Sequence, residues 1–260
     1  MKILRIVFLN LIILTLCACQ SDFSNSDVLS QVSTIDALLD GVYDGTVTCG
    51  ELRQLGDFGI GTFDALEGEM IILDSRIYQV KTDGTAYLVD DNEKTPFASV
   101  TFFKTDKKIK LPPGLTYKQF EKMVDLLIGS DNLFYAVKVT GNFKSMKTRS
   151  VPKQKKPYPQ LKDVVKHQKI FNFKNISGTI VGFRSPQYVK GLNVTGYHLH
   201  FLTEDHKAGG HILDFTTGDI TLELDTKSDF FMTLPNIKSF RKSNLTKDRS
   251  KELKSVEKIH

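Results

Sequence analysis

The sequence predicts a mixed α+β fold, in which strands and helices do not alternate strictly along the chain. Many short runs are apolar or alternate between apolar and polar residues, and turn signals such as Thr82-Asp83-Gly84 and Asp90-Asp91-Asn92 separate them. Few segments carry a helical pattern. The composition is ordinary for a globular protein, because 40% of the 260 residues are hydrophobic and 25% are charged.

The expected helices begin at residues that can cap them. Ser33 can cap a first helix, in which apolar residues are spaced three and four apart. Thr116 and Gln119 form a capping box for a second helix, which we expect to stop at Gly129. A third helix is expected from Leu161 to His167.

The expected strands are apolar or alternating runs, and a turn at Thr217-Gly218-Asp219 should separate the last two of them. They are Glu69–Leu73, Arg76–Val80, Ala86–Val89, Ala98–Phe103, Phe134–Thr140, Gly178–Phe183, Tyr197–Leu202, Ile212–Asp214 and Thr221–Leu224. Each half of the chain also has a glycine-bearing run that ends in phenylalanine and leads to candidate site residues. This weak repeat, from Gly59 to Phe63 and from Gly178 to Phe183, hints at internal duplication.

Three closely spaced histidines are the clearest chemical signal. His198 and His200 lie two apart in a β-prone run, so they should share one side of a strand. A polar, glycine-bearing hairpin follows, and the returning strand should bring His211 beside His200. Three converging imidazoles with an open coordination position predict a catalytic metal site, such as a zinc site. The alternative is that one or two of these histidines are merely packed or exposed.

Three separated blocks resemble the signatures of the α-acetolactate decarboxylases. The first is GDFGIGTF followed by EGEM, from Gly56 to Met70. The second is TRSVPKQ followed by PYPQL, from Thr148 to Leu161. The third contains GFRSP, GLNV, GYHLHF and GGH, from Gly182 to His211. The similarity covers about residues 31–235, and it implies two similar β-α-β-rich halves with mixed sheets and a metal site between them.

The resemblance implies a lyase that converts 2-acetolactate, a 2-hydroxy-3-oxo acid, to acetoin in acetoin and butanediol metabolism. The ketone next to the breaking bond can accept the electron pair, so no organic cofactor is expected. The implied cofactor is Zn²⁺ or another divalent cation, which would stabilise an enediolate as a Lewis acid. A homodimer is also implied.

The resemblance further assigns three catalytic residues. Arg149 would orient the substrate carboxylate, although its position in a basic stretch would also suit a surface arginine. Glu69 lies in an apolar run and would hold groups at the metal or handle a proton, with Glu67 as its competitor. The family also uses an acid from the C-terminal tail, for which Glu257 matches best by position and Glu252 is the substitute.

The N-terminal residues are typical of an exported protein. Lys2 and Arg5 precede a short apolar core that ends at Leu16-Cys17-Ala18-Cys19, as in a bacterial lipoprotein signal. Cys19 is therefore expected to carry a lipid that anchors the mature chain to a membrane. The alternative is ordinary signal cleavage and a secreted or periplasmic protein. Cys49 would then be the only other cysteine of the mature chain, and a buried structural thiol is expected there.

The chain divides accordingly into a signal peptide (1–19), a tether (20–30), an N-terminal half (31–150), a C-terminal half with the histidine site (151–235) and a basic tail (236–260). The formal charge of +5 is concentrated in that tail. The tail lacks interleaved aromatic residues and nucleic-acid motifs, so we expect no nucleic-acid partner and interpret most of it as a solvated or membrane-facing segment.

Two other functions fit the histidines alone. A zinc hydrolase or hydratase could use the same three imidazoles to activate water. A metal-scavenging lipoprotein that catalyses nothing is the third candidate, although it should carry further exposed histidine clusters, and the sequence shows none.

Overall fold

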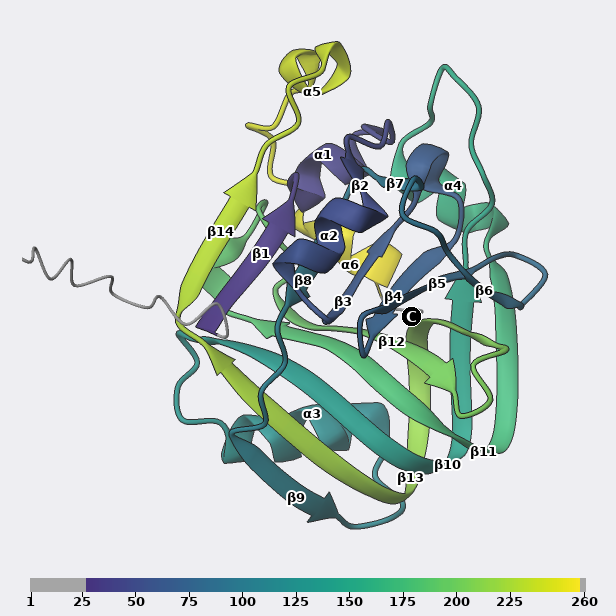
Figure 1. Ribbon diagram of the computed structural model, residues 1–260, viewed down its shortest axis with the longest axis vertical. Coiled ribbons are helices and arrows are strands. Elements are labelled where there is room, and N and C mark those ends of the chain that lie inside the picture. Colours follow the sequence, from purple (N-terminus) through teal and green to yellow (C-terminus); the bar gives the residue numbers. More distant parts are fainter. Residues whose placement is uncertain (1–26, 258–260) are drawn as a thin grey trace, which may run out of the picture.

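The computed structural model describes residues 27–257 and confirms the mixed α+β class. Two large sheets pack against each other, and short helices lie around them (Figure 1). The expected signal peptide with Cys19, and the expected tether up to residue 26, lie outside the described residues. Within the described part of the chain, no helix is both long and apolar enough to cross a membrane.

The first sheet has seven strands in the order β14-β1-β8-β3-β4-β5-β6. Their bounds are β14 Asp229–Thr233, β1 Val28–Val32, β8 Ala98–Thr101, β3 Phe58–Thr62, β4 Glu69–Leu73, β5 Arg76–Val80 and β6 Ala86–Leu88. Neighbours are antiparallel except β1 and β14, which pair in parallel. The predicted strands Glu69–Leu73 and Arg76–Val80 are confirmed to the residue.

The second sheet has the order β10-β11-β12-β13-β9, and β10 also pairs with β13. The pairings β10–β11, β11–β12, β12–β13 and β13–β10 therefore form a closed loop. The bounds are β9 Lys107–Leu111, β10 Phe134–Ser150, β11 Lys169–Ser185, β12 Gly196–Thr203 and β13 Gly209–Lys227. A third, small sheet pairs β2 Val47–Thr48 with β7 Lys94–Thr95.

One predicted turn is wrong. Thr217-Gly218-Asp219 lies inside β13, so the two strands expected on either side of it are one strand. The signal marks a bulge instead, because the pairing of β13 with β10 shifts register between Gly141 and Phe143. The strong local twist of a bulge uses the same residue types as a turn, which is why the two patterns look alike.

The helices are short. They are α1 Ile35–Leu39, α2 Cys49–Leu55, α3 Tyr117–Leu127, α4 Leu161–Val164, α5 Lys238–Lys242 and α6 Ser250–Glu257, with 3-10 segments at Asp64–Leu66, Val165–His167 and Gln187–Val189. The Thr116 capping box is confirmed, and α3 stops one residue before Gly129, at an extended Ile128. The third helix is also confirmed, as α4 followed by a 3-10 turn.

The predicted cap of the first helix is wrong by one residue. Ser33 has a φ of +64° and lies outside the helix, while the Thr34 hydroxyl accepts a hydrogen bond from the Ala37 amide at 3.2 Å. The helix also ends earlier than its apolar stripe suggests. Asp40 caps it, and Gly41, with a φ of +90°, turns the chain away.

The sheets do not follow the order of the chain. The second sheet takes β9 and β10 from before residue 151, whereas the first sheet takes β14 from after residue 227. The helix α3 packs on the second sheet through Tyr117, Phe120 and Val124. In contrast, α1, α4 and α6 share a cluster of buried side chains with Phe97 and Val151.

Candidate active site

The three histidines converge as predicted. His198 and His200 come from β12, and His211 comes from β13, where it lies directly opposite His200 in the sheet register. The ring centroids lie 5.2 to 5.3 Å apart, and one ligand nitrogen from each ring lies within 4.8 Å of the other two. Leu199 and Phe201 alternate with His198 and His200 along β12 and point into the core of the second sheet, as strand alternation requires.

A glycine allows β13 to approach β10 at the site. Gly210 has a φ of +129°, and a Cβ added there would lie 2.4 Å from the Arg149 carbonyl oxygen. Any side chain would therefore push β13 away from β10 and displace the register pair of Arg149 with His211. The Gly-Gly pair recognised in the sequence is thus a requirement of close strand packing.

The environment keeps the imidazoles neutral. Burial lowers the pKa of His198 to about 3, and it lowers the pKa values of His200 and His211 well below the usual range, with the Arg149 guanidinium adding to the effect. Neutral imidazoles have the lone pair that a metal ligand needs.

The atoms around His200 fit a divalent cation. His200 Nδ1 lies 2.8 Å from the Met70 carbonyl oxygen, which can only accept, so Nδ1 carries the proton and Nε2 carries the lone pair. Nε2 is buried and has no hydrogen-bond partner among residues 27–257. A buried nitrogen lone pair without a hydrogen-bond donor is costly, and one that lies close to two other imidazoles can coordinate a cation.

Glu69 and Arg149 form a buried ion pair beside the histidines. Arg149 Nη1 donates to Glu69 Oε1 at 2.6 Å, and both side chains are about 5% exposed. Glu69 Oε2 lies 3.7 Å from His200 Nε2. Burial raises the pKa of the Glu69 carboxyl to about 7, and the Arg149 guanidinium opposes that rise. Arg149 is therefore no surface residue, despite its basic neighbours in the sequence.

The two competing glutamates lie elsewhere. Glu67 is partly exposed and forms ion pairs with Lys81 and Lys153, each at 3.1 Å, which lower the pKa of its carboxyl. Glu252 accepts a hydrogen bond from Arg249 at 3.1 Å.

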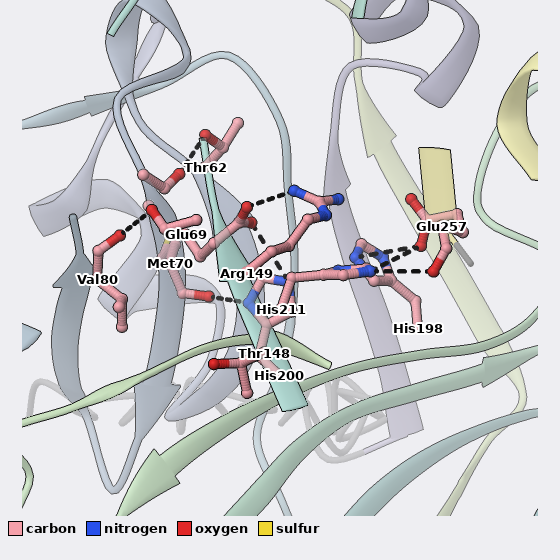
Figure 2. Close-up of polar contacts among 12 residues, drawn as sticks. Thr62, Glu69, Met70, Val80, Thr148, Arg149, His198, His200, His211 and Glu257 are labelled. Carbon is pink, nitrogen blue, oxygen red and sulfur yellow. Dashed lines mark hydrogen bonds and ion pairs between the residues drawn. The ribbon is translucent and has the colours of Figure 1, made fainter. Parts of the chain in front are cut away.

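Glu257 approaches the histidines from the side opposite Glu69 (Figure 2). Its Oε2 lies 3.9 Å from His198 Nε2 and 3.7 Å from His211 Nε2. The residue ends α6, whose Leu253 and Val256 are buried against α1 and α4. The interpretation of most of the basic tail as solvated holds for Lys251 and Lys254 of α6, which are exposed, but is wrong for Arg249, which is buried.

The model of one protein family, described as alpha-acetolactate decarboxylase, matches residues 29–247 of this chain. The chain belongs to the alpha-acetolactate decarboxylase family. A relative of that name from Methanosarcina mazei is 54% identical over 239 residues, which cover 91% of this chain and 83% of the relative. One from Bacillus subtilis is 44% identical, covering 87% of this chain and 89% of the relative. The chain is therefore an enzyme of the decarboxylase class.

Solved structures agree with this family assignment. The crystal structure of alpha-acetolactate decarboxylase from Bacillus subtilis strain 168 has a TM-score of 0.88 with this fold, at 43% identity, and covers 89% of this chain and 100% of that one. A protein of unknown function from Staphylococcus aureus, described as similar to alpha-acetolactate decarboxylase, has a TM-score of 0.85 at 34% identity, covering 88% and 100% of the two chains.

Glu257 lies between two hollows in this decarboxylase. The inner one, of about 30 Å³, is lined by Glu69, Arg149, His198, His200 and Glu257 together with apolar side chains such as Leu38 and Phe97. Since one water needs roughly 10–15 Å³, the inner cavity has room for about two waters. The outer cleft, of about 580 Å³, is lined by Tyr197, Leu253, Lys254 and again Glu257.

Two features near the site were missed in the sequence. The Met70 carbonyl orients His200, and a backbone oxygen gives no residue-type signal. Arg249 is buried at the start of α6, although it was counted with the exposed basic tail. The stripe Arg249, Leu253, Val256 and Glu257, at helical spacing, was the available signal.

Proposed function

We propose that this enzyme decarboxylates 2-acetolactate to acetoin, with a divalent cation held by His198, His200 and His211. The observation that carries the proposal is the buried cluster of three neutral imidazoles, flanked by the Glu69–Arg149 pair, in a chain of the alpha-acetolactate decarboxylase family. A bound cation would supply Lewis-acid stabilisation of the negative charge that develops on the substrate oxygens.

The substrate binds as an anion and must lose that carboxylate as carbon dioxide. Arg149 is the buried cation of the site, and its Nε has no hydrogen-bond partner among residues 27–257. The guanidinium donates to Glu69 through Nη1, and its other N–H groups can donate to a carboxylate. We assign Arg149 to holding and orienting the carboxylate of the substrate.

Loss of carbon dioxide leaves an enediolate, because the electron pair of the broken bond delocalises onto the neighbouring ketone. The hydroxyl-bearing carbon must then gain a proton. Glu69, with its pKa raised to about 7 by burial, is present in both protonation states near neutral pH and can deliver that proton from a carboxyl oxygen. Glu257 faces His198 and His211 from the other side, and we assign it to closing the site around the cation.

The proposed cation lies between the two sheets. The histidines belong to the second sheet, whereas Glu69 and the Met70 carbonyl belong to β4 of the first sheet. Contacts of β4 with both β12 and β13 across this boundary support a metal site between the two parts of the fold. The native metal could be Zn²⁺ or another divalent ion, since three imidazoles accept several.

A zinc hydrolase or hydratase is not favoured, because the chain belongs to a family of decarboxylases. A scavenging protein is not favoured for the same reason. Both would bind a metal at the three histidines without converting acetolactate.

The first experiment follows acetoin from racemic 2-acetolactate with residues 20–260, against the spontaneous reaction. We expect acetoin formation that stops when a chelator removes the metal and returns when Zn²⁺, Mn²⁺ or Co²⁺ is added. His198→Ala should lose both metal and activity. The control is His167→Ala, because His167 is exposed. Metal binding without acetoin formation would overturn the proposal, and activity that survives in His198→Ala would overturn the site.

We also propose that the protein is exported, that Cys19 carries a lipid anchor, and that the enzyme forms a homodimer. The N-terminal signal supports the first two, and the family resemblance supports the third. Metabolic labelling with a fatty acid should mark the wild type and not Cys19→Ala. Sedimentation of the soluble enzyme measures its oligomeric state.

A further inference from the structure

We propose that Arg249 is a positioning residue, which fastens α6 to α1 and thereby holds Glu257 against the histidines. The inference deepens the proposed function, because it rests on a role for Glu257 at the site. Its starting point is a buried ion pair that the catalytic chemistry does not use. Arg249 is only 6% exposed, and its Nη2 contacts Asp40 Oδ1, at the end of α1.

Arg249 stands where α6 begins. Its carbonyl oxygen accepts the Leu253 amide at 2.8 Å, which is the first turn of the helix, and its Nη1 donates to Glu252 Oε2 at 3.1 Å. The guanidinium thus connects the start of α6 to Asp40 of α1 and also pairs with Glu252 in the first turn of α6. A guanidinium suits this task because its rigid fork can bind two carboxylates at once.

The same helix face carries Glu257 to the site. Arg249, Leu253, Val256 and Glu257 follow the spacing i, i+4, i+7 and i+8, which places them on one side of a helix. Leu253 and Val256 are buried in the cluster with Ile35 and Leu161. Because a helix is rigid, the orientation of its first turn fixes where Glu257 lies, about 12 Å farther along the axis.

The ion pair of the residue before Arg249 is weak. Lys190 Nζ contacts Asp248 Oδ2 at 3.0 Å, but both side chains are more than half exposed. Exposed pairs of this kind contribute little to docking, whereas breaking a buried pair leaves an unpaired charge inside the protein. The Arg249–Asp40 pair is therefore the strong polar contact at the start of α6, whereas the contacts at its end are those of Glu257 with the histidines.

The test is a double-mutant cycle of Arg249→Gln and Glu257→Gln in the metal-loaded enzyme. If Arg249 acts through Glu257, Arg249→Gln should lower kcat/KM at least about tenfold in the wild type and by less than about twofold in the Glu257→Gln background. Arg249→Lys should recover part of the loss. Arg241→Gln is the matched control, because Arg241 is an exposed arginine of α5 in the same tail.

Two readouts are independent of activity. Amide exchange should speed up in α6 and not in α3 when Arg249 is replaced, and the affinity for Zn²⁺, measured by chelator competition, should fall as it does in Glu257→Gln. Asp40→Asn breaks the same pair from the other side, so it repeats the test if Arg249→Gln folds poorly. Equal losses of activity in both backgrounds, or unchanged exchange in α6, would overturn the proposal. A wild type that forms no acetoin would instead overturn the proposed function, while the exchange and affinity measurements still decide the role of Arg249.

Discussion

Glu69 is the only charged residue of β4, and it is as buried as the apolar residues that follow it. It is a carboxyl in an apolar strand, buried beside a guanidinium and an imidazole. Replacement by glutamine keeps the shape and a hydrogen bond but removes the transferable proton. We expect Glu69→Gln to lower kcat by about 10²–10⁴ with a smaller change in KM, measured by steady-state acetoin formation. Glu67→Gln is the control and should stay near the wild type, because Glu67 faces lysines at the surface. Equal losses in the two variants would contradict the assignment.

The burial of the Cys49 thiol leads to a prediction about its alkylation rate and about stability at high pH. Burial raises its pKa to about 11, and the side chain is fully buried. Reagents attack the thiolate, so alkylation of the native protein should be slow at pH 8 and fast after denaturation. In the folded protein the Cys49 thiol stays protonated at pH values where the unfolded chain would lose this proton. Its contribution to stability is therefore complete below about pH 8.5 and is lost as the pH rises toward 11. Rapid labelling of the native protein at pH 8 would contradict the buried environment.

The site was predictable from sequence where chemistry and periodicity coincide. His198, His200 and His211 follow from strand alternation and a hairpin, and the structure places their rings together. The roles of Glu69, Arg149 and Glu257 needed the family resemblance, because Glu69 and Arg149 are 80 residues apart in the chain and Glu257 is 46 residues from His211. The burial of Arg249 was not predicted, because its acidic partner Asp40 lies far away in the sequence.

At the scale of elements, the capping box of α3 predicts a change in stability without a change in activity. Thr116 accepts from the Gln119 amide, and Gln119 accepts from the Thr116 amide. Thr116→Ala should lower the free energy of unfolding by about 1 kcal/mol, measured by urea denaturation. Acetoin formation by the folded enzyme should not change. The α3 helix packs on one face of the second sheet, and the histidines point from the other face. A loss of kcat in this variant would contradict that separation.

Elements with a strong local signal were predicted well, and others were not. The strands from Glu69 to Val80 and the α3 helix have clear periodicity and caps. The lengths of β10, β11 and β13, at 17 to 19 residues, exceed what alternation indicates. Their outer parts are half exposed and mixed in composition, and the cross-strand ladder maintains them. The α6 helix was not predicted, because its stripe at helical spacing contains only two buried apolar residues.

At the scale of the whole molecule, the proposed cation should stabilise the fold. It would join the two strands of the histidine hairpin at a boundary between the sheets. A ligand present at 100 times its Kd adds about 2.7 kcal/mol, which corresponds to several degrees in Tm for a chain of this size. Calorimetry should show that increase on adding Zn²⁺ to chelated enzyme. His198→Ala should show a much smaller increase, and equal increases would place the binding elsewhere.

The parallel pairing of β1 with β14 has a consequence for biosynthesis. β1 is the first described strand to leave the ribosome, and it waits for β14 before its sheet is complete. Then α6 follows, and with it the acid that faces His198 and His211. The nascent chain can therefore form most of both sheets while its active site still lacks one wall. A chain truncated after β14 should therefore keep the strands of both sheets and the three histidines but lack the acid that faces His198 and His211.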